Sequence, residues 1–115
     1  ALNLRGQLLS GFTDEVFSVA DILIAPSVPM AVPTIAETDM SANQGFLDMI
    51  ARFGSCPRPF NFLGLPALGL PCGFTGNGLP TGYQIVGRSF DEATLFRAAR
   101  AFERETGCTD NAPAL

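Results

Sequence analysis

Apolar side chains recur every three or four positions over the first nineteen residues of the chain. This spacing, from Leu2 to Val19, predicts an amphipathic helix that buries one face. No capping residue precedes the pattern, so we expect the chain to open inside a helix whose start is a cut end. Gly11 interrupts the pattern, and Thr13 is placed to cap a second helical part after it.

A short apolar run follows over residues 21–26 and stops at Pro26. Continuous apolar runs of this length are typical of strands that α/β sheets bury on both faces. The next segment, as far as Asp39, contains two more prolines and no periodicity, so we expect an extended loop. Ligand pockets in α/β folds form where such loops leave buried strands. The sequence therefore places a candidate ligand-binding loop directly after its first strand.

A second amphipathic helix is predicted over residues 44–53. Ser41 or Asn43 can cap its start, and Gly54 can end it. In the following segment, residues 56–59, two prolines interrupt regular helical structure. Residues 60–65 are then expected to form one or two further helical turns.

Two apolar runs, residues 67–72 and 81–87, are predicted to pair as a hairpin of buried strands. The segment between them contains the polar, glycine-rich turn 75–78. Pro71 has no backbone N–H to donate to a neighbouring strand, so we expect it at a bulge, a strand end or a sheet edge.

The last predicted helix has the clearest start and stop signals. Ser89 or Asp91 can cap its start, and Gly107 follows its last residue, Thr106. Its apolar residues lie near one face and its arginines on the other. The expected buried face consists of Ala93, Leu95, Phe96, Ala99 and Phe102.

The composition suggests an incomplete domain. The chain has 115 residues, which allows one domain at most, and 47% of them are hydrophobic while only 16% are charged. A charged share near 25% is usual, and small domains have the most surface to cover with polar groups. Two interpretations remain: a packed domain with an adhesive face, or, as we favour, residues 1–115 as a single partial domain cut from a larger core.

Charge and cysteine content exclude several classes of function. The net charge is −4, and all seven basic residues are scattered arginines, so we expect no nucleic-acid partner. No apolar run is long enough for a membrane span, and the amino terminus lacks the features of a secretory signal. The three cysteines have irregular spacing and no histidine beside them, so we expect no metal or other cofactor. They are interpreted as reduced thiols of a cytoplasmic protein, with Cys72 as a small core residue.

No single motif of the chain is diagnostic of a family, but the motifs taken together in their order are. Asp-Ile-Leu-Ile-Ala-Pro-Ser is followed by the proline loop, Phe-Asn-Phe-Leu-Gly-Leu-Pro-Ala, Leu-Pro-Thr-Gly-Tyr-Gln-Ile-Val-Gly-Arg and Phe-Asp-Glu-Ala-Thr-Leu. The set resembles the carboxyl-terminal quarter of amidase signature enzymes and covers nearly the whole chain. It implies an α/β fold: the carboxyl-terminal part of an α/β/α sandwich with a mixed β-sheet.

The resemblance implies amide chemistry but brings no catalytic residue to this chain. Members of the family hydrolyse amides, or transfer ammonia from glutamine toward charged tRNA, with a serine nucleophile activated through a second serine by a lysine. This chain has no lysine, no histidine and no Gly-Gly-Ser-Ser-Gly run, so the Ser-Ser-Lys portion is absent and we expect the chain alone to be inactive. We expect it to need the amino-terminal remainder of the amidase as partner, with a small amide as the substrate of the whole.

By analogy with the family, two parts of the chain would face the acyl side of the substrate. These are the loop after the first strand and the end of the helix before the Phe-Asn run. The candidate substrate-binding residues are Ser27, Met30, Ala51, Gly54 and Ser55. Gly54 offers no carboxylate for a substrate amino group, which favours a general amidase over the glutamine-using branch. Asn61 is expected to satisfy backbone groups, and Arg88 to form an ion pair at the sheet edge.

Other hypotheses stay open at this point. The chain could be a non-catalytic binding or assembly module, or the corresponding part of the A subunit of a glutamine-dependent tRNA amidotransferase. It could also be an independent enzyme that uses a carboxylate pair or a thiol, a hypothesis that mutation of Cys56 or Asp39 would test. Exposed apolar faces and open strand edges would favour self-association of the chain.

Overall fold

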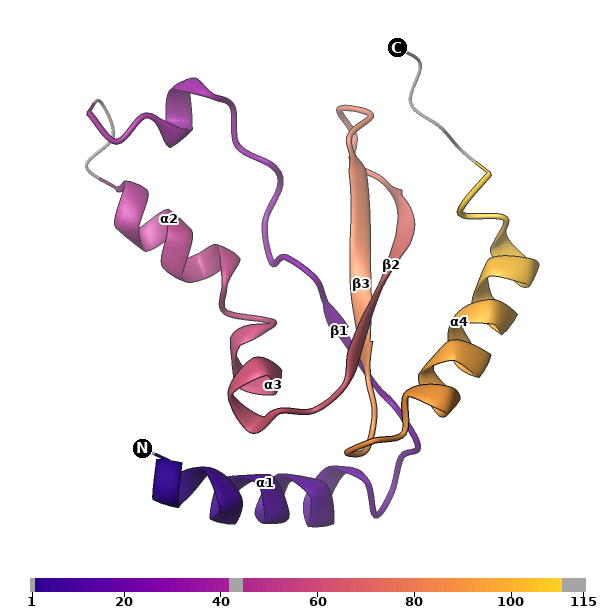
Figure 1. Cartoon of the computed structure of the whole chain (residues 1–115). Coiled ribbons are helices and arrows are strands. Elements are labelled where there is room, and N and C mark those ends of the chain that lie inside the picture. Colours follow the sequence, from indigo (N-terminus) through magenta and orange to yellow (C-terminus); the bar gives the residue numbers. More distant parts are fainter. Residues whose placement is uncertain (1, 42–44, 111–115) are drawn as a thin grey trace.

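The computed structural model describes residues 2–41 and 45–110 and shows helices arranged around a small sheet (Figure 1). In chain order the elements are α1 (Leu2–Val16), β1 (Leu23–Pro26), the 3-10 helix η1 (Ala36–Thr38), α2 (Phe46–Phe53), α3 (Arg58–Leu63), β2 (Ala67–Phe74), β3 (Pro80–Val86) and α4 (Glu92–Thr106). The α/β class expected from the sequence is confirmed.

The sheet has three antiparallel strands in the order β1-β3-β2, with β3 at its centre. The predicted pairing of the hairpin is confirmed, and its register shifts between Pro71 and Gly73, so Pro71 lies at a bulge as expected. The prediction that both its strands are buried is wrong for β2, which lies at the other edge of the sheet and has Leu70 as its one buried residue. The prediction that β1 is buried on both faces is wrong for this chain. Ile24 is 64% exposed, because β1 lies at one edge of the described sheet and its outer side chains have no cover there.

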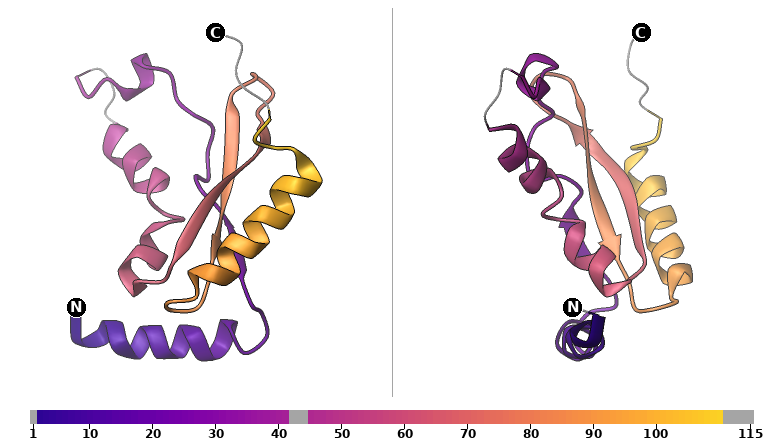
Figure 2. Two further views of the ribbon diagram at one scale, coloured as in Figure 1. Left: turned by 45° about the vertical axis from the view of Figure 1, so that its right-hand side comes forward. Right: turned by 60° about the vertical axis from the view of Figure 1, so that its left-hand side comes forward.

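Two small cores lie on opposite faces of β3. Successive residues of a strand point to opposite faces, so Val86 and Ile85, both buried, belong to different clusters. Val86 packs with Phe17 and residues of α3, whereas Ile85 packs with Leu70 and with Leu95 of α4. Figure 2 shows α4 along one side of the sheet, α2 and α3 along the other, and α1 across one end.

The helix boundaries correct several details of the prediction. α1 runs without a break through Gly11, so Thr13 caps nothing. α2 begins after Gly45, and the side chain of Ser41 instead donates to Asp39; the alternative cap, Asn43, lies outside the described residues. α3 begins at Arg58, before the predicted start, because a proline fits the first turn of a helix, where no N–H is needed.

α4 follows its predicted signals closely. The Asp91 carboxylate accepts from the Thr94 N–H, and Gly107 ends the helix in the left-handed conformation. The expected buried face is only partly correct, because Ala93 and Phe96 are exposed while Leu95 and Ala99 are buried.

The molecule exposes more surface than a compact domain of its mass. Its accessible area is 8062 Å², whereas a compact monomer of 12.2 kDa exposes about 6,100 Å². Its radius of gyration is 16.7 Å, against about 13 Å for a compact chain of this length, and its smallest extent is 18 Å. Large apolar side chains on α1, α2, β1 and the loop between them are therefore open to solvent.

Candidate functional site

The loop that follows β1 forms a small recess against the hairpin, with a cavity of about 100 Å³. Ser27 and Met30 line it from the loop, and Thr81 and Gly82 line it from β3. Phe53, the last residue of α2, closes another side. The structure thus brings together two of the predicted site residues with others that were not predicted, among them Phe53, Thr81 and Gly82.

Backbone contacts hold this loop on β3. The Ser27 N–H donates to the Gly82 carbonyl at 3.3 Å. The buried Gln84 side chain donates through Nε2 to the Pro26 carbonyl at 2.9 Å, which satisfies a polar group that the end of β1 would otherwise leave unpaired. Gly82 itself allows the close approach, because a Cβ there would lie 2.8 Å from the Leu70 carbonyl oxygen.

The other predicted site residues lie at the end of α2 and do not line this recess. Ala51 and Ser55 are exposed, and the Ser55 hydroxyl donates to the Arg52 carbonyl at 2.7 Å. Gly54 lies beside Arg58, whose guanidinium would be 2.7 Å from an added Cβ. The helical periodicity marked Phe53 as the last apolar residue of its helix, but that pattern alone does not show that its side chain reaches the recess.

The lining of the recess is uncharged. Its polar side chains are the hydroxyls of Ser27, Thr75 and Thr81, and its other members are apolar or glycine. The Thr75 hydroxyl accepts from the Leu79 N–H within the turn. Such a recess can hold a small neutral group by apolar contact and hydroxyl hydrogen bonds. It offers no general base for activating a hydroxyl nucleophile.

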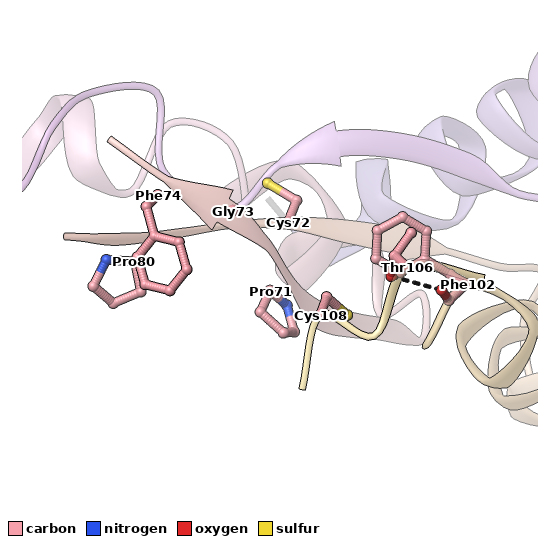
Figure 3. A pocket seen from close by; sticks show the side chains of 8 residues that line it. All are labelled: Pro71, Cys72, Gly73, Phe74, Pro80, Phe102, Thr106 and Cys108. Atoms are coloured by element: carbon pink, nitrogen blue, oxygen red, sulfur yellow. Dashed lines mark hydrogen bonds between the residues drawn. The ribbon is translucent and has the colours of Figure 1, made fainter. Parts of the chain in front are cut away.

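A separate cavity of about 240 Å³ lies between β2 and the end of α4 (Figure 3). Cys72, Cys108 and the ring of Phe102 line it. Cys72 is exposed, so its prediction as a core residue is wrong: the bulge that follows Pro71 carries it out of the packed part of the strand. Among residues 2–41 and 45–110, no group of three acidic, cysteine or histidine side chains could hold a metal ion.

Tyr83 packs edge-on against Phe102, with ring centroids 5.1 Å apart. Burial raises the pKa of Tyr83, and the negative charge of the nearby Cys108 and Cys72 thiolates raises it further. Because the pKa is higher in the folded chain, ionisation of Tyr83 opposes folding. The stability that the neutral phenol contributes is fully present at pH values below its ordinary pKa of about 10, and it is lost as the pH rises through the higher pKa of the folded chain.

This shift can be measured cleanly, because the chain has one tyrosine and no tryptophan. Titration followed by the ultraviolet absorbance of tyrosinate should give a higher midpoint in buffer than in concentrated urea. Phe102→Ala, which opens one side of the phenol to water, should bring the two midpoints closer. Identical midpoints for the folded and unfolded chain would show that Tyr83 is not packed in this way.

Arg88 forms the predicted ion pair, with Asp21 at 3.9 Å. The Asp21 side chain is 93% exposed, so this pair adds little stability. Arg88 also donates to the carbonyls of Phe17 and Ala20 and lies over the Phe17 ring. Its larger role is to join the end of β3 to the turn after α1. Asn61 is exposed on α3, so its predicted role in satisfying buried backbone groups is not supported.

In the part of the chain that the structure describes, no helix is both long and apolar enough to span a membrane.

Comparison with known proteins identifies the family. A sequence model of the Amidase family matches residues 4–96. The A subunit of glutamyl-tRNA(Gln) amidotransferase from Brevibacillus brevis is 37% identical over 107 residues, which cover 93% of this chain and 21% of that protein. The protein of the same name from Anaeromyxobacter dehalogenans is 44% identical over 95 residues, or 82% of this chain and 18% of that one.

Among solved structures, 6-aminohexanoate cyclic dimer hydrolase superposes on 96% of this chain with a TM-score of 0.74 and 29% identity, and the match covers 24% of that protein. The chain spans about a fifth of the length of the curated relatives it matches. Its fold is that of the carboxyl-terminal part of amidase signature enzymes, and the chain belongs to the amidase family.

Proposed function

We propose that this chain is one part of an amidase that hydrolyses the carbon–nitrogen bond of a small neutral amide, and that it supplies scaffold and one wall of the substrate pocket. The observation that carries the proposal is the uncharged recess after β1, in a member of the amidase family. The acyl group of the substrate would lie between Met30 and Phe53, with the Ser27 and Thr81 hydroxyls within reach of its polar atoms.

The chemistry itself requires residues that this chain does not contain. Acyl transfer needs an activated nucleophile, a base and donors that stabilise the oxyanion. Without lysine or histidine, the serines of this chain have only carboxylates as potential bases, and carboxylates activate hydroxyls poorly. The nucleophile and its base would therefore come from the amino-terminal remainder of the protein, which we infer to be the main partner of this segment.

The recess assignment can be tested in a polypeptide that also contains the proposed amino-terminal remainder. Phe53→Ala enlarges the recess, so kcat/KM should rise about tenfold or more for an amide whose acyl chain is longer by one or two methylenes. Ser55→Ala, a matched change at the end of the same helix but away from the recess, should leave the preference unchanged. If Ser55→Ala shifted the preference and Phe53→Ala did not, the substrate would lie against the exposed residues around Ser55 and not in the recess that Phe53 lines.

A second candidate is the A subunit of a glutamine-dependent amidotransferase. The identity of 37–44% to proteins of that name favours it. The absence of a carboxylate from the recess lining weighs against it, because glutamine carries an ammonium group that needs a counter-charge. Ammonia release from glutamine by the longer polypeptide, faster than from hexanamide, would favour the amidotransferase. The reverse order would favour the amidase.

We also infer a reducing compartment such as the cytoplasm, since the three cysteines are free thiols and none forms a disulfide.

A further inference from the structure

Hydrogen bonds attach the recess loop, residues 27–33, to the sheet only at its start. The Ser27 N–H donates to the Gly82 carbonyl at 3.3 Å, and Gln84 Nε2 donates to the Pro26 carbonyl at 2.9 Å. Pro26 has no N–H of its own with which to pair with β3. In the part of the chain that the structure describes, residues 28–33 form no hydrogen bond with the sheet. Where the loop leaves β1 is therefore decided at these two bonds.

Gln84 forms the tighter of the two bonds. A distance of 2.9 Å is usual for an N–H···O bond, whereas 3.3 Å lies beyond the usual range. Gln84 is also the one polar or charged residue that is buried in the described part of the chain, with 6% of its surface exposed. A buried amide that lost its partner would carry a desolvation cost with nothing to offset it, so the bond is held firmly. Because Gln84 is buried within this chain, the contact does not depend on what covers the open surfaces of the segment.

The alternation of side chains along β3 places Gln84 between the recess and a core. Gly82, Gln84 and Val86 share one face of the strand. Gly82 lines the recess, and Val86 belongs to the apolar cluster around Phe17. No charged side chain lines the recess or belongs to that cluster. Gln84 is thus the polar link between the packed end of this face and its open end, although 58 positions separate it from Pro26 in the sequence.

We propose that Gln84 is a positioning residue for substrate binding: through the Pro26 carbonyl it sets how far Ser27 and Met30 stand from β3, and hence the width of the recess. Gln84 itself does not line the recess and would touch no substrate. A substrate held between Met30 and Phe53 would be selected for acyl length by the width that Gln84 maintains. The effect on the substrate rests on the proposed function, whereas the attachment of the loop does not.

The decisive variant is Gln84→Glu, measured in the 115-residue chain at about pH 5 and about pH 8. A protonated carboxyl can donate to the Pro26 carbonyl, whereas the ionised form has only acceptors and repels it. Burial disfavours the ionised form and raises the pKa of the introduced carboxyl above its ordinary value of about 4.3. The bond is therefore present at low pH and is lost as the pH rises through the raised pKa. The protection of the Ser27 amide against hydrogen exchange should match the wild type at the lower pH and fall about tenfold or more at the higher pH.

Gln7→Glu is the matched control, because it makes the same substitution at an exposed position of α1, away from the recess. It should leave the protection of the Ser27 amide unchanged at both pH values. Gln84→Leu removes the donor at every pH and should lower the protection at both. If Gln84→Leu fails to fold, Gln84→Glu still carries the test, because the low pH restores the bond in the same protein.

The effect on the substrate is measured in the polypeptide that also contains the proposed amino-terminal remainder. Relative to the wild type, Gln84→Glu should alter the ratio of kcat/KM between a short and a longer amide about tenfold at the higher pH and little at the lower pH. The change should lie in KM rather than in kcat, since Gln84 touches no reacting group.

The two measurements separate the two claims. Protection of the Ser27 amide in Gln84→Glu that equals the wild type at the higher pH would overturn the proposal, whatever the recess binds. Reduced protection with an unchanged amide preference would support the role of Gln84 in holding the loop and would overturn the proposed function of the recess.

Discussion

Phe17→Ala should unfold most of the chain under conditions in which the wild type is folded. Phe17 is 2% exposed and joins α1 to the cluster around Phe60, Leu63 and Val86. Its ring also packs edge-on against Phe12 and lies under the Arg88 guanidinium. Removing a buried phenylalanine costs about 3–5 kcal/mol, and an open chain of this size has little stability beyond that.

Urea unfolding followed by far-ultraviolet circular dichroism measures this loss. Phe96→Ala is the control, because that ring is 63% exposed and alanine is a better helix former. The control should change the midpoint little. A Phe17→Ala chain as stable as the Phe96→Ala chain would mean that the cluster between α1 and β3 does not hold the fold together.

Gly82→Val should separate β2 from β3 and open the recess. A Cβ at this position would lie 2.8 Å from the Leu70 carbonyl oxygen, which is backbone and cannot rotate away. We expect a cost of at least about 1–3 kcal/mol from this crowding. The Gly82 carbonyl also holds the Ser27 N–H, so exchange of the Ser27 amide with solvent deuterium should accelerate.

Gly69→Val provides the matched comparison on the edge strand of the same sheet. No atom lies within 4 Å of a Cβ built there, and valine suits a strand better than glycine does. We expect Gly69→Val to be neutral or slightly stabilising. Equal losses of stability at both positions would show that the close approach of β2 and β3 does not require glycine at position 82.

The elements with local signals were predictable from the sequence. The helix α4 has an aspartate cap and a terminal glycine, and Pro71 could only lie at an irregular point of its strand. One local signal was missed. Thr34 and Glu37 bond reciprocally at the start of η1, as the spacing of a capping box allows, and these hydrogen bonds lower the pKa of the Glu37 carboxyl.

The features that depend on packing were not predictable. Gly11 favours a break in α1, yet the helix continues because contacts of its neighbours with the core outweigh the cost of one glycine. The apolar sequence of β1 predicts burial, but whether a strand is covered depends on what lies beside it. For the site, the direction in which α2 docks decides that Phe53 rather than Ala51 or Ser55 reaches the recess, and helical periodicity does not fix that direction.

We propose that this segment forms part of an amidase pocket but performs no catalysis without the residues that the rest of the protein would supply. The most direct measurement is hydrolysis of a small neutral amide by the purified 115-residue chain, compared with the polypeptide extended upstream of Ala1. We predict that the chain alone releases ammonia no faster than buffer and that the extended protein turns the amide over. Turnover by the chain alone, abolished by Cys56→Ser or Asp39→Asn, would instead show that residues of this chain carry out the catalysis.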